Sequence, residues 1–244
     1  MAERLLADAG IAVGMRVLDV GCGRGDVSLM IARLVGEQGR VLGIDRDARP
    51  LAAARERAGE LDLSNVAFAE GDLCALSPEH GSFDAVVGRR VLMYQPDPAH
   101  AVRQFARALR PGGLVVFQEH DATMTPGRLT PLPLHERVHE WVWRTVEREG
   151  ADIHMGFHLP SVLAQAGLAV EQVRAEAVVQ TPGTHYPAGA IVRAMLPRIV
   201  QHGVATEEEV DVDTLDQRLI EEREKANAAY VGDMVFSAWA RKPV

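Results

Sequence analysis

The sequence predicts an α/β protein with a Rossmann-like, doubly wound, mostly parallel sheet of seven strands and helical cap insertions. Three observations lead to this fold class. Short apolar segments alternate with helical segments over residues 1–120, glycines follow the first apolar segment directly, and two helix-rich stretches interrupt the alternation later in the chain. Such alternation is typical of βαβ units, whose helices cover both faces of a parallel sheet.

The strands are expected at seven short segments rich in apolar and β-branched residues. Strands that are buried on both faces of a parallel sheet need such side chains. The seven segments are 17–20, 41–44, 66–69, 83–87, 114–118, 168–179 and 231–240.

Apolar residues at helical spacing predict the helices between these strands. The expected helices are 26–35, 50–61, 99–109, 134–148, 160–166 and 188–200, and a charged helix follows that begins with a capping box at Thr206–Glu209. The run Arg110–Gly113 is expected to end the helix 99–109, because proline and glycine break helices. In the helix 134–148, the residues that should form the buried stripe are Leu134, Val138, Trp141 and Thr145.

These elements divide the chain into segments of one domain. Residues 1–120 form the expected cofactor-binding core, and residues 121–157 form a helical cap insertion. Residues 158–180 return to the core with a helix and a strand. Residues 181–229 form a second cap insertion, and residues 230–244 supply the last core strand.

The composition limits which class of protein this chain belongs to and which partners it can have. The chain has 244 residues, of which 47% are hydrophobic and 25% charged, and this is the composition of an ordinary globular protein. Two cysteines make no disulfide framework, and the start MAERLLADAG lacks a secretory pattern, so a cytoplasmic protein is expected. The expected assembly is a monomer or a homodimer. A net charge of −8 argues against a nucleic-acid partner, and no apolar run is long enough to span a membrane.

The most informative segment is DVGCGRG, residues 19–25, between the first strand and the first core helix. Closely spaced glycines allow a tight turn and let a ligand approach the backbone. A nucleotide cofactor is the usual ligand at this place in an open α/β sheet. A dinucleotide fingerprint requires a third glycine at the sixth position, where this chain has Asp26. The dinucleotide interpretation is therefore disfavoured.

Two further acids lie at the ends of the next strands. Asp45 follows the glycines by about 20 residues, the position from which a carboxylate binds ribose hydroxyls. Asp72 ends the third strand in the segment EGDL, residues 70–73. An isolated aspartate at a strand-to-helix junction is often only a helix cap. Asp19, Asp45 and Asp72 each lie on or directly after a different strand, and the three acids together indicate a nucleotide site.

With these residues the sequence resembles the class I S-adenosylmethionine-dependent methyltransferases. The resemblance is to the small-molecule branch, methyltransferase type 11-like, that includes the ubiquinone- and menaquinone-type enzymes. The matching segments are VLDVGCGRG at 17–25, GID at 43–45, EGD at 70–72, FDAVVGRRVLMY at 83–94 and LRPGGLVVF at 109–117.

The resemblance implies S-adenosylmethionine as the cofactor and S-adenosylhomocysteine as its product. It implies that Asp19 and the loop residues Gly21, Cys22 and Gly23 hold the methionine part of the cofactor. The backbone near Arg89 is expected to contact the same part.

The resemblance also implies a ribose and adenine site. Asp45 would bind the ribose hydroxyls, and Arg46 would flank the adenine. Asp72 would accept from the adenine amino group, and Leu73 would donate its backbone N–H, with Gly71 in the same turn.

The segment after the fourth strand narrows the substrate class. Similarity to amino-DNA methyltransferases would require an Asn/Asp-Pro-Pro-Tyr tetrapeptide there, and the chain reads GRRV at 88–91. Cytosine-C5 enzymes resemble one another in a Pro-Cys pair at that place, and neither Cys22 nor Cys74 is near it. A small-molecule substrate is therefore favoured, with methylation of oxygen, nitrogen or carbon left open.

Six of the nine histidines lie between residues 120 and 185, and two of them offer a competing function. The run HERVH at 135–139 matches the H-E-x-x-H zinc pattern on an expected helix, with Glu136 as a potential base. A zinc-dependent hydrolase is thus one alternative, but it leaves the nucleotide-site acids unexplained, and no metal is expected. A non-catalytic S-adenosylmethionine-binding protein is the other alternative.

His120 is the first candidate for a catalytic residue. It directly follows the fifth strand, and ligands of open α/β sheets bind at the carboxyl ends of the strands. An imidazole can accept a proton near neutral pH, and Glu119 or Asp121 could orient it. His154, from the cap, is the reserve candidate.

Overall fold

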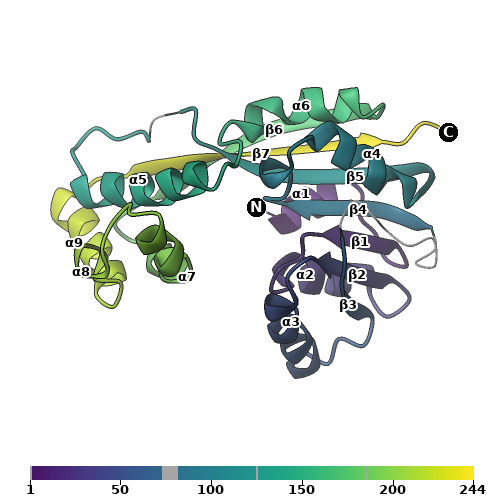
Figure 1. Cartoon of the computed structure of the whole chain (residues 1–244), viewed down its shortest axis with the longest axis horizontal. Coiled ribbons are helices and arrows are strands. Elements are labelled where there is room, and N and C mark those ends of the chain that lie inside the picture. The colour runs from purple at the N-terminus through teal and green to yellow at the C-terminus, as the bar shows by residue number, and fades with distance from the viewer. Residues whose placement is uncertain (1, 73–81, 125, 185) are drawn as a thin grey trace. The chain divides into compact units, whose positions relative to one another are not determined.

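The computed structural model describes residues 2–72, 82–124, 126–184 and 186–244. Its seven strands form one mixed, mostly parallel sheet in the order β3-β2-β1-β4-β5-β7-β6 (Figure 1). The predicted Rossmann-like fold is therefore confirmed. The strands are β1 Arg16–Val20, β2 Arg40–Asp45, β3 Val66–Glu70, β4 Phe83–Arg89, β5 Leu109–Asp121, β6 Ala169–Gln180 and β7 Tyr230–Arg241.

Parallel pairing brings the carboxyl ends of the first four strands to one edge of the sheet. Val20 of β1 pairs with Ile44 of β2 on one side and with Gly88 of β4 on the other. Asp45 pairs with Glu70 of β3. Residues that follow these strand ends are consequently neighbours in space.

The helices begin and end close to the positions that the sequence predicts. They are α1 Ala2–Asp8, α2 Asp26–Val35, α3 Ala48–Glu60, α4 Pro98–Arg107, α5 Pro133–Arg148, α6 Met155–Gln165, α7 Ala188–Gln201, α8 Glu207–Val210 and α9 Leu215–Ala226, with a short 3-10 helix η2 at Leu92–Tyr94.

The described chain divides into two compact units. The first comprises residues 1–119, 155–174 and 236–244, and the second comprises residues 120–154 and 175–235. Strands β5, β6 and β7 each contribute residues to both units (Figure 1). In the first unit, apolar side chains of α1 and α2 pack on β1, β2, β4 and β5, for example Leu6 and Ile31 against Val17 and Val116.

The second unit contains α5, α7, α8 and α9. Helix α5 packs against α7 and α9, and Val138, Trp141 and Thr145 are buried as predicted. Leu134 is only half-buried, whereas the three unexpected buried residues of this helix are His135, Trp143 and Val146.

Three expected boundaries were wrong for local reasons. Helix α4 ends at Arg107, and Leu109 already pairs with Phe83, so the proline and glycines lie at an irregular start of β5. Helix α6 begins at Met155, upstream of Pro160. The charged helix is divided in two, because Asp211 adopts a left-handed conformation with φ of 42° after α8. Among the described residues, no helix is both long and apolar enough to cross a membrane.

Candidate functional site

The glycine loop joins β1 to α2 at the edge where the strands end. Gly21 and Gly23 have φ of 65° and 52°, a backbone region in which side chains other than glycine are strained. The N–H groups of Gly21 and Cys22 both donate to the Ile44 carbonyl, at 2.8 and 3.1 Å. Apart from its chain neighbours, no atom of the described residues lies within 4 Å of a Cβ placed on Gly23, so these residues leave open space beside this part of the backbone.

Asp45 connects the glycine loop to the loop that follows β2. Its Oδ2 accepts from the Gly23 N–H at 2.8 Å, and its Oδ1 accepts from the Asp47 N–H at 3.0 Å. Each carboxylate oxygen can accept a second hydrogen bond. Asp45 therefore fixes the loop and keeps acceptor capacity for a ligand's hydroxyl groups.

Asp19 lies beneath the loop, where its side chain is buried. Its Oδ2 accepts from the Ser28 hydroxyl of α2. Burial raises the pKa of this carboxyl to about 7, against the lowering effects of the Ser28 hydrogen bond and of the positive charge of Arg89. Burial also raises the pKa of the neighbouring Cys22 thiol, so that thiol is protonated at neutral pH and unreactive.

The predicted adenine side of the site is described only in part. The Gly71 N–H donates to the Asp45 carbonyl at 3.0 Å, which places the turn after β3 beside the end of β2. Arg46 and Asp72 are exposed at the same edge. Leu73, together with Cys74, lies outside the described residues.

Arg89, at the end of β4, brings a positive charge to the other side of the glycine loop. One guanidinium nitrogen lies 3.8 Å from the Asp26 carboxylate at the start of α2, and Arg57 donates to the same carboxylate at 2.7 Å. The structure thus brings together Asp19, Asp45, the glycine loop and Arg89, as the sequence predicts.

In the second unit, His120 belongs to a cluster around Asp233 of β7. The Asp233 carboxylate accepts from the Trp143 indole N–H at 2.8 Å and lies 2.9 Å from His139 Nε2. The His139 contact is close but does not have the geometry of a hydrogen bond. His120 Nδ1 lies 3.7 Å from the other carboxylate oxygen. Asp233 is the functional candidate that sequence reasoning missed.

The electrostatics of this cluster favour an ionised carboxylate. Burial alone would raise the pKa of Asp233, but its contacts with His120, His139 and Trp143 outweigh burial and hold that pKa well below its usual range. A carboxylate beside Nδ1 favours the His120 tautomer that carries its proton on Nδ1. The acceptor nitrogen of that tautomer is Nε2.

The expectation that Glu119 orients His120 was wrong. Glu119 is completely buried, and its Oε1 accepts from the backbone N–H groups of Val91 and Leu92, at 3.0 and 2.8 Å. Asp121 Oδ1 accepts from the Thr123 N–H at 2.7 Å. The carboxylate that lies beside the imidazole, 3.7 Å from Nδ1, comes instead from β7.

His154, the reserve candidate, is exposed and belongs to a different contact. Its Nδ1 lies 2.7 Å from the Thr123 hydroxyl, and its backbone N–H donates to Asp152 at 2.9 Å. The contacts that link the Asp233 cluster do not include His154.

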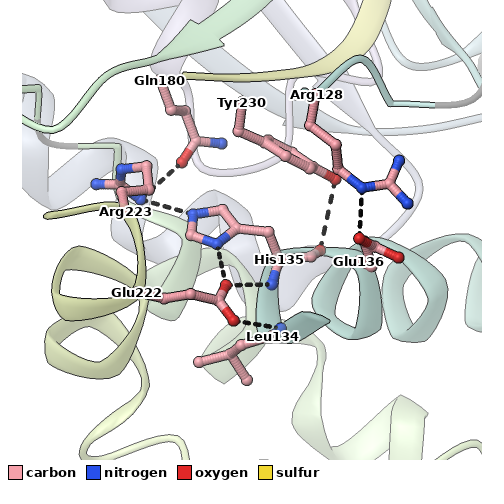
Figure 2. A network of polar contacts seen from close by, with 8 residues as sticks. All are labelled: Arg128, Leu134, His135, Glu136, Gln180, Glu222, Arg223 and Tyr230. Atoms are coloured by element: carbon pink, nitrogen blue, oxygen red, sulfur yellow. Dashed lines mark hydrogen bonds and ion pairs between the residues drawn. The ribbon is translucent and has the colours of Figure 1, made fainter. Parts of the chain in front are cut away.

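The HERVH segment forms a polar network instead of a pair of zinc ligands (Figure 2). His135 Nδ1 lies 2.6 Å from the Glu222 carboxylate, and Nε2 lies 2.8 Å from an Arg223 guanidinium nitrogen, so both ring nitrogens have protein partners. Because the guanidinium can only donate, Nε2 accepts and Nδ1 carries the proton. Glu136, the potential base, pairs with Arg128.

This network explains why His135 is buried. Glu222 also accepts from the backbone N–H groups of Leu134 and His135, at 2.8 and 3.1 Å, and so caps α5, which has no side-chain cap of its own. Arg223 donates further to Gln180 at 3.1 Å. Among the described residues, no three His, Cys, Asp or Glu side chains gather in a metal-binding arrangement. This geometry supports a structural role for His135.

Comparison with known families and curated proteins adds independent findings. The model of a family described as "Methyltransferase domain" matches residues 11–167 of the chain. A demethylmenaquinone methyltransferase of Staphylococcus aureus is 36% identical over 124 residues, which are 51% of this chain and 51% of that protein. The chain thus spans about half the length of the curated relatives it matches.

Solved structures share the fold at low sequence identity. A protein of Bacillus halodurans C-125, described as a candidate methyltransferase, superposes with a TM-score of 0.66 at 18% identity, covering 100% of this chain and 99% of that one. A geranyl diphosphate methyltransferase in complex with S-adenosylmethionine has a TM-score of 0.59 at 20% identity, covering 99% of this chain and 84% of that one.

Proposed function

This chain belongs to the methyltransferase domain family, and on that premise we propose that it transfers a methyl group from S-adenosylmethionine to a small molecule. S-adenosylmethionine is the cofactor of this family. The observation that carries the proposal is the hydrogen bond from the Gly23 N–H to Asp45, at 2.8 Å, beside the open space at Gly23. A loop and a carboxylate held in this way fit a ribose-bearing ligand.

The residues at this edge fit the cofactor in chemical type. Asp45 keeps oxygen acceptors for the two ribose hydroxyls, and Asp72 supplies an acceptor for the adenine amino group. Asp19 and the loop residues Gly21 to Gly23 support the methionine part from below. When bound, the cofactor supplies an electrophilic methyl group on a sulfonium, so the protein's main tasks are to align the acceptor atom and to exclude water.

His120 is the group that we assign to proton removal. An oxygen or nitrogen acceptor must lose a proton when it is methylated, and the acceptor nitrogen Nε2 of His120 can take it. Asp233 stabilises the imidazolium that results, because its carboxylate remains ionised beside Nδ1. His120 directly follows Glu119 in β5, and the Glu119 carboxylate accepts from backbone N–H groups of the turn after β4. His154 remains the reserve candidate.

The small-molecule assignment rests on two further observations. The proteins to which the chain is similar include a demethylmenaquinone methyltransferase and, by fold, a geranyl diphosphate methyltransferase, both named for small substrates. The chain carries a net charge of −8, which opposes binding to a nucleic-acid backbone.

The experiment is a turnover assay with methyl-labelled S-adenosylmethionine and a library of phenols, amines, quinols and activated-carbon acceptors. We expect label in at least one product, with a matching yield of S-adenosylhomocysteine. Tight cofactor binding without transfer to any acceptor would instead support a binding protein without catalysis. No binding at all would contradict the proposal.

A further inference from the structure

The turn after β4 has an unusual backbone that needs an external support. Strand β4 pairs with β5 up to Arg89 and Gln118, and the next residue, Arg90, adopts a left-handed conformation with φ of 58°. A residue with a side chain is strained in that region. The Arg90 N–H donates to the Gln118 carbonyl at 2.9 Å, and the chain then enters the 3-10 helix η2.

Glu119 supplies this support from the end of β5. Its side chain is completely buried, and one carboxylate oxygen accepts from two successive backbone N–H groups, those of Val91 and Leu92. These are donors at the start of a helix that has no side-chain cap of its own. The second carboxylate oxygen is buried and makes no hydrogen bond with the described residues. Glu119 thus uses a single oxygen to fix two residues of the turn.

The Val91 side chain connects the turn after β4 to the glycine loop, because it packs against Gly21. This side chain is buried, and a Cβ placed on Gly21 would lie only 2.5 Å from Val91 Cγ2. The Val91 side chain therefore fills the space directly against Gly21. Any shift of the turn after β4 would open or crowd the loop that we assign to the methionine part of the cofactor.

We propose that Glu119 is a positioning residue of the cofactor site, which holds Val91 against Gly21 through its bonds to the turn after β4. This inference rests on the proposed function, because it assumes that the glycine loop binds S-adenosylmethionine. Glu119 does not contact the ligand in this account. It acts through Val91.

The test measures the dissociation constant for S-adenosylhomocysteine by calorimetry, together with thermal unfolding. Glu119→Ala should weaken binding at least tenfold, because it leaves two buried N–H groups unpaired and frees the turn. Glu119→Gln keeps an acceptor oxygen at the same place and should bind within about threefold of the wild type. Gln118→Ala is the matched control, because Gln118 precedes Glu119 in β5 and its buried side chain donates to Ser237 of β7. The substitution removes that bond but keeps the backbone carbonyl that accepts from Arg90 in the turn.

A double-mutant cycle tests whether Glu119 acts through Val91. Val91→Ala alone should weaken binding by about fivefold, and adding Glu119→Ala to it should cost much less than the same change costs in the wild type. Additive effects would overturn the proposal, as would a Glu119→Ala protein that binds like the wild type. If Glu119→Ala does not fold, Val91→Ala decides alone, and wild-type affinity in that variant refutes the inference. If the wild type does not bind the ligand, the proposed function has failed instead.

Discussion

Replacing Asp45 is the most direct perturbation of the cofactor site. In the structure this carboxylate accepts from the Gly23 and Asp47 N–H groups, at 2.8 and 3.0 Å. In the proposed complex it also accepts from the ribose. Asp45→Ala removes at least one charge-assisted hydrogen bond to the ligand, which is worth about 1.5–3 kcal/mol. Cofactor binding should therefore weaken by about 10- to 150-fold.

Two further variants separate the loss of a ligand contact from a general loosening of the loop. Asp45→Asn keeps one acceptor oxygen and should fall between the wild type and Asp45→Ala. Asp47→Ala, two residues away, removes the cap of α3, where the Asp47 side chain accepts from the Arg49 N–H at 3.0 Å, together with the exposed ion pair between Asp47 and the Arg49 guanidinium. It should bind S-adenosylhomocysteine within about threefold of the wild type, because this cap takes no part in the proposed ligand site.

The assay is a calorimetric titration of each variant with S-adenosylhomocysteine, after thermal unfolding has shown that the variant is folded. Two results would refute the reasoning. The first is an Asp45→Ala protein that binds within threefold of a tightly binding wild type. The second is an equal loss for Asp47→Ala, which would indicate a general loosening of the loop instead of a lost ligand contact.

The remaining predictions concern catalysis and stability. His120→Ala should lower turnover by about 10²–10⁴ at unchanged cofactor affinity and remove the acid limb of the pH–rate profile, because a general base must be deprotonated to act; normal turnover would transfer the assignment to His154. Burial raises the pKa of Glu119 from 4.5 to about 7, so the native state holds the extra proton, and this group's contribution to the free energy of unfolding falls as pH rises from about 4.5 to 7. Urea unfolding should show that Glu119→Gln lacks this fall, of about 3 kcal/mol at most, and equal slopes would contradict it. Glu222→Ala unpairs the N–H groups at the start of α5 and should cost about 1–3 kcal/mol in urea unfolding, whereas the exposed neighbour Glu221→Ala should cost under about 0.5; equal losses would argue against the cap.

The sequence could predict the core and the position of the candidate site, the glycine loop with Asp19 and Asp45 beside it, because both depend on local signals. Strand segments, helical spacing and glycines are readable within a few residues. Parallel pairing then places the carboxyl ends of β1 to β4 at one edge, so Asp19 and Asp45 had to lie near the glycine loop. Helix α2, predicted at residues 26–35, has those bounds in the structure.

The parts that the sequence did not predict depend on long-range partners. Asp233 accepts from the indole N–H of Trp143, which is 90 residues away in the sequence. No local pattern marks an aspartate in the last strand as a partner of two histidines. The HERVH segment matched a zinc pattern by spacing alone. Whether His135 faces a metal or a protein partner is decided by Glu222 and Arg223, which approach it from α9.

The central claim is that the glycine loop and its neighbouring acids bind S-adenosylmethionine. The measurement that tests it most directly is a calorimetric titration of the purified wild-type protein with S-adenosylmethionine, with S-adenosylhomocysteine and with NAD. We expect one site per chain, with a dissociation constant on the order of micromolar for the first two ligands and no measurable binding of NAD. Absence of binding heat for both sulfur ligands, or NAD binding of equal strength, would contradict it.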